Sequence, residues 1–193
     1  PKLTLNSDLR GVSRRLPQVG WAKSAGTEGT LALAATLGGQ QRVESLRVEG
    51  AGLSADGSVT IRPDGGLDRA RFSRVRIGGW LDAPVDMVGR GDAPPSITIL
   101  GGTVDMRRTD FGSSSTSSGG GSGGGASSPV SVTLDRLQVT DTIALTAFAG
   151  AFTTSGGMDG TFSGRVNGQT PVTGRIVPQG GRTAVRVLSD DAG

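Results

Sequence analysis

The sequence contains no cysteine, no histidine and no tyrosine, and aromatic residues make up only 4% of its 193 positions. Without cysteine the chain has no disulfide framework and no catalytic thiolate. Without histidine it lacks Ser-His-Asp and Cys-His catalysis, the common zinc sites and the usual general base near neutral pH. Only carboxylate chemistry or an oxygen-ligand metal remains open, so we expect no enzyme activity, no catalytic residue, no metal and no cofactor.

Long apolar segments are also missing. Hydrophobic residues total 34%, and no run approaches the roughly 18 apolar residues that a membrane-spanning helix needs. Basic residues number 20 and acidic residues 17, which gives a formal net charge of only +3. An excess this small does not indicate a nucleic-acid partner, and we expect none. Because Pro1 and Gly193 both fall inside patterned sequence, we expect the chain to be a piece of a longer protein.

Glycine, by contrast, is abundant, with 34 residues, and 9 prolines add further turn signals. Between them lie short runs in which apolar and polar residues alternate, the pattern of half-buried antiparallel strands. Strands are predicted at 29–37, 45–49, 58–62, 70–77, 80–90, 96–100, 102–107, 130–139, 142–153, 158–166, 171–177 and 182–188. In the second half, glycines are expected to separate the runs, at Gly150, Gly157, Gly160, Gly164, Gly168 and Gly174. A change of apolar parity near Ser73 predicts a β-bulge, and a short helix is indicated only at 8–15.

A low-complexity segment divides the chain. Residues 112–129 read GSSSTSSGGGSGGGASSP, a composition that buries no apolar surface and predicts a flexible linker. The linker separates a first β-sheet segment, 1–111, from a second, 130–193, which we expect to continue the same sheet.

The apolar side of such a sheet needs a cover. An antiparallel sheet with one apolar face is covered by helices, by a second sheet or by curling on itself. Since almost no amphipathic helix is predicted, we expect an all-β fold with little helix: a curled antiparallel sheet with a U-shaped apolar groove, or alternatively a β-sandwich. The expected inner face consists of Leu31, Leu33, Leu37, Leu46, Val48, Val59, Ile61, Ile143, Leu145, Val166 and Ile176.

Four arginines form the densest charged feature of the sequence, at Arg69, Arg71, Arg74 and Arg76. We interpret them as a solvated strand edge, where charge opposes edge-to-edge aggregation. Contact with anionic lipid headgroups or nucleic-acid phosphates is the less favoured alternative.

The acidic residues show no catalytic arrangement. Turn or cap positions are the favoured interpretation of the pairs Asp105/Asp110 and Asp190/Asp191, and Asp56-Gly57 and Asp64-Gly65 are read as turns. Trp21 is expected to cap the core at one end of the sheet.

Several phrases of the sequence resemble the AsmA-like C-terminal region of proteobacterial envelope proteins, the AsmA, TamB and YhdP superfamily. They are VGWAKSAGTEGTL at 19–31, GAGLSADGSV at 50–59, LDRARFSRVRIGG at 67–79 and GGTVDMR at 101–107. The strongest similarity, to YhdP-type alphaproteobacterial members, lies in LDRLQVTDTIALTAFAGAFTTSGGMDGTFSGRVNG at 134–168 and GRTAVRVLSDDAG at 181–193. The resemblance covers nearly all of the chain except the linker, and its motifs are structural.

The resemblance implies a location and a function. Members of this superfamily are anchored in the inner membrane of Gram-negative bacteria by one N-terminal helix, which we expect to lie outside this piece, and they extend through the periplasm. Their curled sheet is expected to carry phospholipid acyl chains along an apolar groove towards the outer membrane. The implied partner is therefore phospholipid or another apolar ligand, without catalysis. The alternative from the residues alone is a structural or interaction module of the cell envelope.

Overall fold

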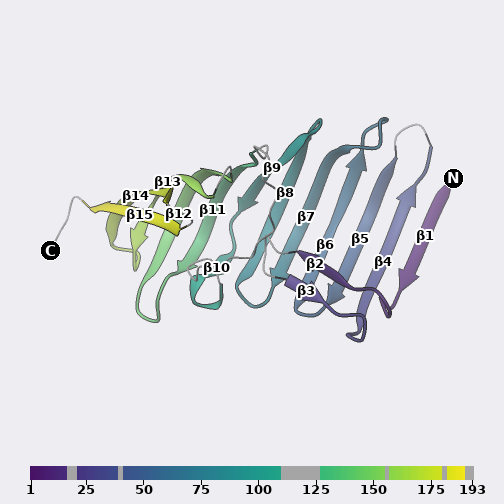
Figure 1. Cartoon of the computed structure of the whole chain (residues 1–193), viewed down its shortest axis with the longest axis horizontal. Coiled ribbons are helices and arrows are strands. Elements are labelled where there is room, and N and C mark those ends of the chain that lie inside the picture. The colour runs from purple at the N-terminus through teal and green to yellow at the C-terminus, as the bar shows by residue number, and fades with distance from the viewer. Residues whose placement is uncertain (17–20, 39–40, 110–126, 155–156, 180–181, 190–193) are drawn as a thin grey trace.

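The computed structural model describes residues 1–16, 21–38, 41–109, 127–154, 157–179 and 182–189, which form one large sheet and one two-stranded sheet (Figure 1). The strands are β1 (Lys2–Ser7), β2 (Arg14–Leu16), β3 (Trp21–Lys23), β4 (Gly29–Thr36), β5 (Arg42–Gly50), β6 (Leu53–Ile61), β7 (Leu67–Ile77), β8 (Leu81–Arg90), β9 (Ala93–Leu100), β10 (Thr103–Asp105), β11 (Pro129–Gln138), β12 (Ala144–Thr153), β13 (Asp159–Val166), β14 (Thr170–Gln179) and β15 (Arg182–Ser189). A 3-10 turn, η2 (Met106–Arg108), follows β10. No helix in the described ranges is long and apolar enough to cross a membrane.

The large sheet has 13 strands in the order β1-β4-β5-β6-β7-β8-β10-β11-β12-β13-β14-β15, with β9 beside β8 and β11. Neighbours are antiparallel except that β11 runs parallel to β9 and β10. Figure 1 shows the sheet extended from β1 to β8 and curled towards β15. The expected all-β fold with a single curled sheet is therefore confirmed, and the described residues do not form two stacked large sheets.

β9 and β10 fill a single position in the sheet. Both pair with β8 on one side and with β11 on the other, and Gly101 and Gly102 separate them with φ angles of 78° and 80°. A Cβ at Gly102 would lie 2.6 Å from the Cα of Ala83, so only glycine allows this close approach. Because β11 pairs with both segments, the chain before and after the Gly/Ser-rich stretch belongs to one sheet. Of the predicted linker, 112–126 lies outside the described residues and Pro129 already belongs to β11.

The pairing register separates an apolar face from a polar face. Leu33 pairs with Leu5 on one side and Leu46 on the other, and Leu145 pairs with Leu137 and Val166. We call the side of the sheet that carries these residues the apolar face. The opposite side, the polar face, carries mainly Thr, Ser, Arg and Asp.

The bulge predicted near Ser73 is confirmed. The pairing of β7 with β8 shifts register between Phe72 and Val75, so the apolar side chains before and after Ser73 point to the same face. The same shift puts the four β7 arginines together on the polar face. Their interpretation as a strand edge is wrong, because β7 lies inside the sheet between β6 and β8.

Two clusters of buried side chains lie on the apolar face. The first contains Ala55, Val75, Ile77, Leu81 and Ala83, and the second contains Leu134, Leu145, Phe148, Phe152 and Val172. Ile99 and Val104 pack against both clusters, which makes the apolar layer continuous. No second layer of described residues covers the second cluster. Its burial therefore comes from side chains of the same face crowded together by the curl of the sheet.

The two-stranded sheet β2–β3 covers part of the apolar face. Trp21 packs against the first cluster, and its Nε1–H donates to the carbonyl of Ala51 at 3.1 Å. The expectation that Trp21 caps the core is confirmed, and its contact with Ala51 puts it at the β5–β6 turn, inside the strand order of the sheet. Figure 1 shows β2 and β3 lying in front of β5 to β7.

The short helix predicted at 8–15 is wrong. Leu9 has a φ of 52°, Gly11 bonds through its N–H to the carbonyl of Ala25, and Arg14 already belongs to β2. The backbone carbonyls of Leu9 and Val12 instead accept hydrogen bonds from the ammonium group of Lys23.

Glycines inside the strands make room for phenylalanine rings. A Cβ at Gly57 would lie 2.6 Å from Cδ1 of Phe72, and a Cβ at Gly160 would lie 2.6 Å from Cδ1 of Phe152. At Gly174 a Cβ would overlap the ring of Phe162. The rings therefore lie over glycines instead of standing away from the sheet.

This arrangement corrects two expectations from the sequence. Gly150, Gly160, Gly164 and Gly174 lie within strands and do not separate them, whereas Gly168 does lie in a turn, with φ of 80°. Asp56-Gly57 is likewise part of β6, not a turn. The turn at Asp64-Gly65 is confirmed, since the N–H of Gly65 bonds to the carbonyl of Arg62.

Candidate functional site

The apolar face brings together most of the residues predicted to line a groove. Leu31 pairs with Val48 and Leu33 with Leu46, and further along the sheet Ile176 pairs with Gly160 and Val185. Val59, Ile61, Leu145 and Val166 lie on the same face in their strands. Leu37 and Ile143 fall outside the strands, just after β4 and just before β12, and are 40% and 41% exposed.

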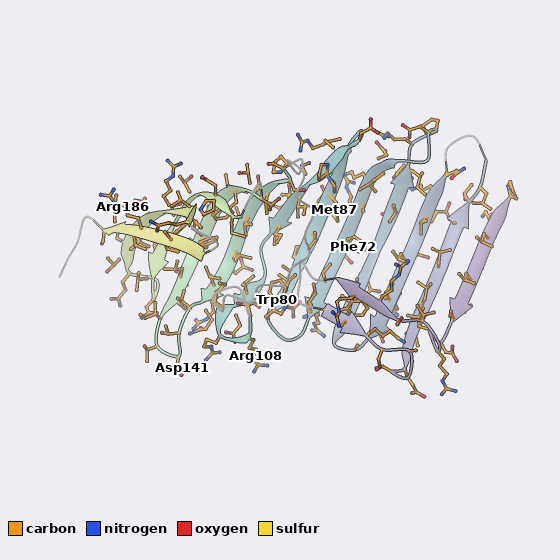
Figure 2. All side chains as sticks on the ribbon, viewed as in Figure 1. Phe72, Trp80, Met87, Arg108, Asp141 and Arg186 are labelled. Atoms are coloured by element: carbon orange, nitrogen blue, oxygen red, sulfur yellow. The ribbon has the colours of Figure 1, made fainter. Side chains whose placement is uncertain are left out.

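Two unbroken rows of paired residues cross this face from β1 to β15. One row consists of Leu5, Leu33, Leu46, Gly57, Phe72, Val85, Ile99, Val132, Gly150, Phe162, Gly174 and Val187. The other consists of Leu3, Ala35, Val43, Val59, Ala70, Met87, Ile97, Val130, Phe152, Gly160, Ile176 and Val185. Every member is apolar or glycine, so each row presents an uninterrupted hydrocarbon path across the strands. Figure 2 marks one residue of each row, Phe72 and Met87, on neighbouring strands.

The aromatic residues of the apolar face were missed by the sequence analysis. Phe72, Phe148, Phe152 and Phe162 all belong to or pack against the buried clusters. A signal for two of them was present, because Gly150-Ala151-Phe152 and Gly160-Thr161-Phe162 place a glycine and a phenylalanine two residues apart, hence on one face of a strand.

The apolar face is open at both ends of the sheet. Leu3 and Leu5 on β1 are 42% and 45% exposed, and Val185 and Val187 on β15 are 56% and 55% exposed. Between these ends the rows are buried or half-buried, and β2–β3 covers them only over the first cluster. Apolar side chains at both ends of a row remain in contact with solvent.

A buried lysine fastens the β2–β3 cover. Lys23 is only 4% exposed, and its ammonium donates to the carbonyls of Leu9 at 2.7 Å, Val12 at 3.1 Å and Ser24 at 3.2 Å. Three acceptors satisfy all three donors of the ammonium group, which offsets the cost of burying it. The cover is thus held by backbone carbonyls of its own segment.

The hollows of the surface, in contrast to the expected groove, are lined mainly by side chains of the polar face. One of about 860 Å³ extends from Thr4 past Ser45 and Ser58 to Thr98, and a second of about 650 Å³ extends from Thr98 past Thr133 to the β15 end. Their walls are small Ala, Ser and Thr side chains between arginines. A third, of about 890 Å³, lies at the ends of β5 to β8, β10 and β11 and is rich in arginine.

Ion pairs between neighbouring strands stabilise the polar face. Arg74 and Arg76 both contact Asp82, at 2.7 and 3.1 Å, and Arg69 contacts Asp86. The hydrogen bonds from Arg74 lower the pKa of Asp82 to about 2, although partial burial of the carboxyl acts to raise it. The hydrogen bond from Arg69 likewise lowers the pKa of Asp86. These arginines therefore hold carboxylates of the neighbouring strand in the charged form.

No metal site is found in the part of the chain that the structure describes. It contains no group of three or more Asp or Glu residues that could hold a metal ion. Asp105 is held by Arg107 at 2.7 Å, which lowers its pKa to about 2 through a side-chain hydrogen bond. Its suggested partner Asp110, like Asp190 and Asp191, lies outside the described residues.

Comparisons with known proteins give no indication of function, so the function is argued from the two faces of the sheet. No family model, no curated protein and no solved structure matches the chain.

Proposed function

We propose that this protein binds the acyl chains of phospholipids on its apolar face and, as part of a longer envelope protein in the periplasm, conducts them between the inner and outer membranes without catalysis. The observation that carries the proposal is the pair of uninterrupted apolar rows that cross the sheet from β1 to β15. The resemblance of the sequence to the AsmA-like region agrees with it.

The energetics favour a ligand that is long and apolar. Each methylene moved from water onto an apolar surface gains about 0.8 kcal/mol. Neighbouring strands lie about 4.8 Å apart, so an acyl chain laid along a row would cross several strands. Binding by partition of this kind needs no polar contact to the chain and leaves the ligand able to slide.

The phenylalanine rings adapt the face to this role. Because Phe72, Phe152 and Phe162 lie over glycines of the same or neighbouring strands, the apolar layer stays thin and even. A ligand therefore meets a smooth hydrocarbon surface, with few steps that would stop it from moving from one strand to the next.

The proposal is tested by titrating the whole chain with a fluorescent fatty acid. Leu46→Arg puts a charge into one row, whereas Ser45→Arg puts the same charge on the polar face of the same strand. We expect Leu46→Arg to weaken binding about tenfold or more, and Ser45→Arg to leave it unchanged. Leu5→Arg, at the exposed end of the same row, gives a second variant at a residue that is 45% exposed.

Equal binding by all four proteins would contradict the proposal, and so would the absence of binding to the unaltered chain. Circular dichroism of each variant establishes that the sheet is retained, so a loss of binding is assigned to the face and not to unfolding.

An interaction module of the envelope is the second candidate function. It is favoured by β1, whose residues Lys2 to Asn6 are all exposed, and by the exposed apolar residues of β15. An open strand edge of this kind accepts a strand from another chain. Binding of a protein partner without any binding of fatty acid would favour this candidate over the first.

A further inference from the structure

The arginine-rich hollow lies where the ends of six strands meet, those of β5 to β8, β10 and β11. Its lining includes Arg76 from β7, Arg107 and Arg108 from η2, Arg136 from β11, and Trp80 from the β7–β8 turn. Figure 2 shows Trp80 and Arg108 at the same lower edge of the sheet. The hollow has a volume of about 890 Å³, which admits a headgroup-sized ligand.

A cross-strand row of the polar face explains why the cations gather there. Arg76 pairs with Asp82, Asp82 with Thr103, and Thr103 with Arg136. Between Arg76 and Arg136 this row therefore contains one acidic residue, Asp82, and one neutral residue, Thr103. Glu49, at the far end of the hollow, pairs with Ser54.

Two carboxylates of the hollow, those of Asp82 and Asp105, form ion pairs with its arginines. Asp105 contacts both Arg107, at 2.7 Å, and Arg108, at 3.5 Å, and its side chain is only 18% exposed. Asp82 is shared between Arg76 and Arg74. Asp82 and Asp105 are therefore each divided between two guanidinium groups, while Arg107 also contacts Asp141 at 2.6 Å. The lining of the hollow contains four arginines and three carboxylates, those of Glu49, Asp82 and Asp105, so positive groups are in excess by one.

Several guanidinium donors are left for a ligand. Arg76 donates to Asp82 through its Nε, and Arg108 comes nearest to Asp105 through its Nε, so in both residues no hydrogen bond joins a terminal nitrogen to a described residue. Among the described residues, the side chain of Arg136 donates hydrogen bonds to the amide oxygen of Gln138 alone, at 2.9 and 2.7 Å. Guanidinium groups with free donors bind phosphate oxygens in a bidentate manner.

The turn beneath the hollow helps to position one of these groups. Gly79 has a φ of 74°, and a Cβ there would lie 2.9 Å from Nη1 of Arg108. The absence of a side chain at Gly79 lets the guanidinium of Arg108 lie over the turn.

Trp80 connects the hollow to the apolar face. Its side chain packs against the first buried cluster and also lines the hollow. Its backbone is fixed on both sides, by the bond of its own N–H to Ile77 and by the bond from Asp105 to its carbonyl. An apolar surface and an anion-binding hollow therefore meet at one side chain.

We propose that this hollow binds the phosphate head of an anionic amphiphile whose alkyl chain lies on the apolar face, with Arg76, Arg108 and Arg136 as its ligands. The inference rests on the proposed function, since it takes the apolar face as the site of the chain. It adds a specificity that partition alone does not supply: a preference for chains that end in a phosphate group.

The test compares dodecyl phosphate, dodecanol and inorganic phosphate, each below the concentration at which it forms micelles or precipitates. Binding is followed by the fluorescence of Trp80 in the Trp21→Phe variant of the whole chain. We expect dodecyl phosphate to bind about tenfold tighter than dodecanol, or about 1.4 kcal/mol, and inorganic phosphate to bind far more weakly than either. The combined variant Arg108→Gln/Arg136→Gln removes the preference for phosphate but leaves the binding of dodecanol unchanged.

Arg165→Gln is the matched control, because Arg165 lies in the same cross-strand row, two strands beyond Arg136, and has the same charge. It is expected to keep the full preference. The inference is overturned if dodecyl phosphate binds no tighter than dodecanol, if Arg165→Gln weakens it as much as the combined variant, or if inorganic phosphate binds as tightly as dodecyl phosphate. The last result identifies a site for free anions. Failure of dodecanol itself to bind contradicts the proposed function, and the inference falls with it.

Discussion

At the scale of single residues, the contacts between glycine and phenylalanine determine the shape of the apolar face. Phe162 lies against Gly174, and Phe152 against Gly160, on paired strands. Each ring fills the space that a side chain on its neighbour would occupy. The face consequently keeps its apolar area while using few large residues, which accounts for a sheet of this size built with 4% aromatics.

Filling one of these glycine positions is expected to destabilise the sheet. A Cβ at Gly174 would overlap the ring of Phe162 and lie 2.9 Å from the carbonyl oxygen of Arg186. We expect Gly174→Ala to lower the free energy of unfolding by about 1–3 kcal/mol, the usual cost of overpacking. Gly164→Ala is the control, because its Cβ would find its nearest neighbours at 3.4 to 3.6 Å. Urea unfolding measures both, and equal destabilisation of the two would contradict this account of the rings.

The ion pairs of the polar face predict a dependence of stability on pH. Asp82 has a pKa of about 2, below its ordinary value of 3.8, chiefly because Arg74 hydrogen-bonds to it. A carboxyl whose pKa is lowered by folding contributes stability that is fully present above its unfolded pKa and is lost as the pH falls through the folded one. We therefore expect the contribution to disappear between about pH 4 and pH 2.

Asp82→Asn tests this assignment. The variant is expected to be less stable than the unaltered chain at neutral pH and to show a flatter dependence of unfolding free energy on pH in the acidic window. Asp92→Asn, at an exposed position without an ion pair among the described residues, is expected to keep the original dependence. Denaturant unfolding at a series of pH values gives the comparison, and parallel curves for Asp82→Asn and the unaltered chain would count against the assignment.

At the scale of elements, the β2–β3 cover depends on one buried ammonium group. Replacing Lys23 by Met keeps the apolar stem but leaves the carbonyls of Leu9, Val12 and Ser24 without their donor. An unsatisfied buried polar group costs about 1–3 kcal/mol. We expect faster amide hydrogen exchange in residues 9–16 and 21–25 of Lys23→Met, with exchange in β11 to β14 unchanged. Lys2→Met, at an exposed position of β1, is the control, and an unaltered exchange pattern in Lys23→Met would rule out this role.

The exposed edges of the two outermost strands, β1 and β15, lead us to expect that copies of the chain associate with one another. β1 and β15 each pair with one strand among the described residues, and both expose apolar side chains. Lysine on an edge strand opposes edge-to-edge pairing. We expect Leu5→Lys/Val187→Lys to reduce the concentration-dependent increase in sedimentation coefficient, and Val88→Lys, at an exposed valine of an inner strand, to have no effect. An increase that is the same in all three proteins would show that the edges are not responsible.

The sequence predicted strands better than it predicted what lies between them. Alternation of apolar and polar residues located β4 to β8 and β11 to β15, because the period of two follows from strand geometry itself. The helix expected at 8–15 failed because a three-residue strand and a turn leave no periodic signal. Glycines such as Gly160 were taken as breaks, since their reason for being in a strand is a ring on the neighbouring strand. The arginine-rich hollow could not be predicted from the sequence, because the strand register that brings Arg76 and Arg136 together joins residues 60 positions apart.

At the scale of the whole molecule, one sheet separates two kinds of surface. The apolar face is continuous from β1 to β15 and is covered only in part by β2–β3, while the polar face carries paired and unpaired arginines. Curling of the sheet buries the centre of the apolar face without a second layer. We therefore expect acyl chains to contact the apolar face, and the polar face to contact only the head of a bound amphiphile at its arginine-rich edge.

The most direct measurement is a photo-crosslinking scan along β5 with a phospholipid as the acceptor. Leu46 and Val48 lie on the apolar face, and Ser45 and Arg47 lie on the polar face of the same strand. A photoreactive residue placed at each position in turn is expected to label the acyl chain at 46 and 48 and not at 45 and 47. Labelling at all four positions alike, or at none, would contradict the assignment of acyl chains to the apolar face.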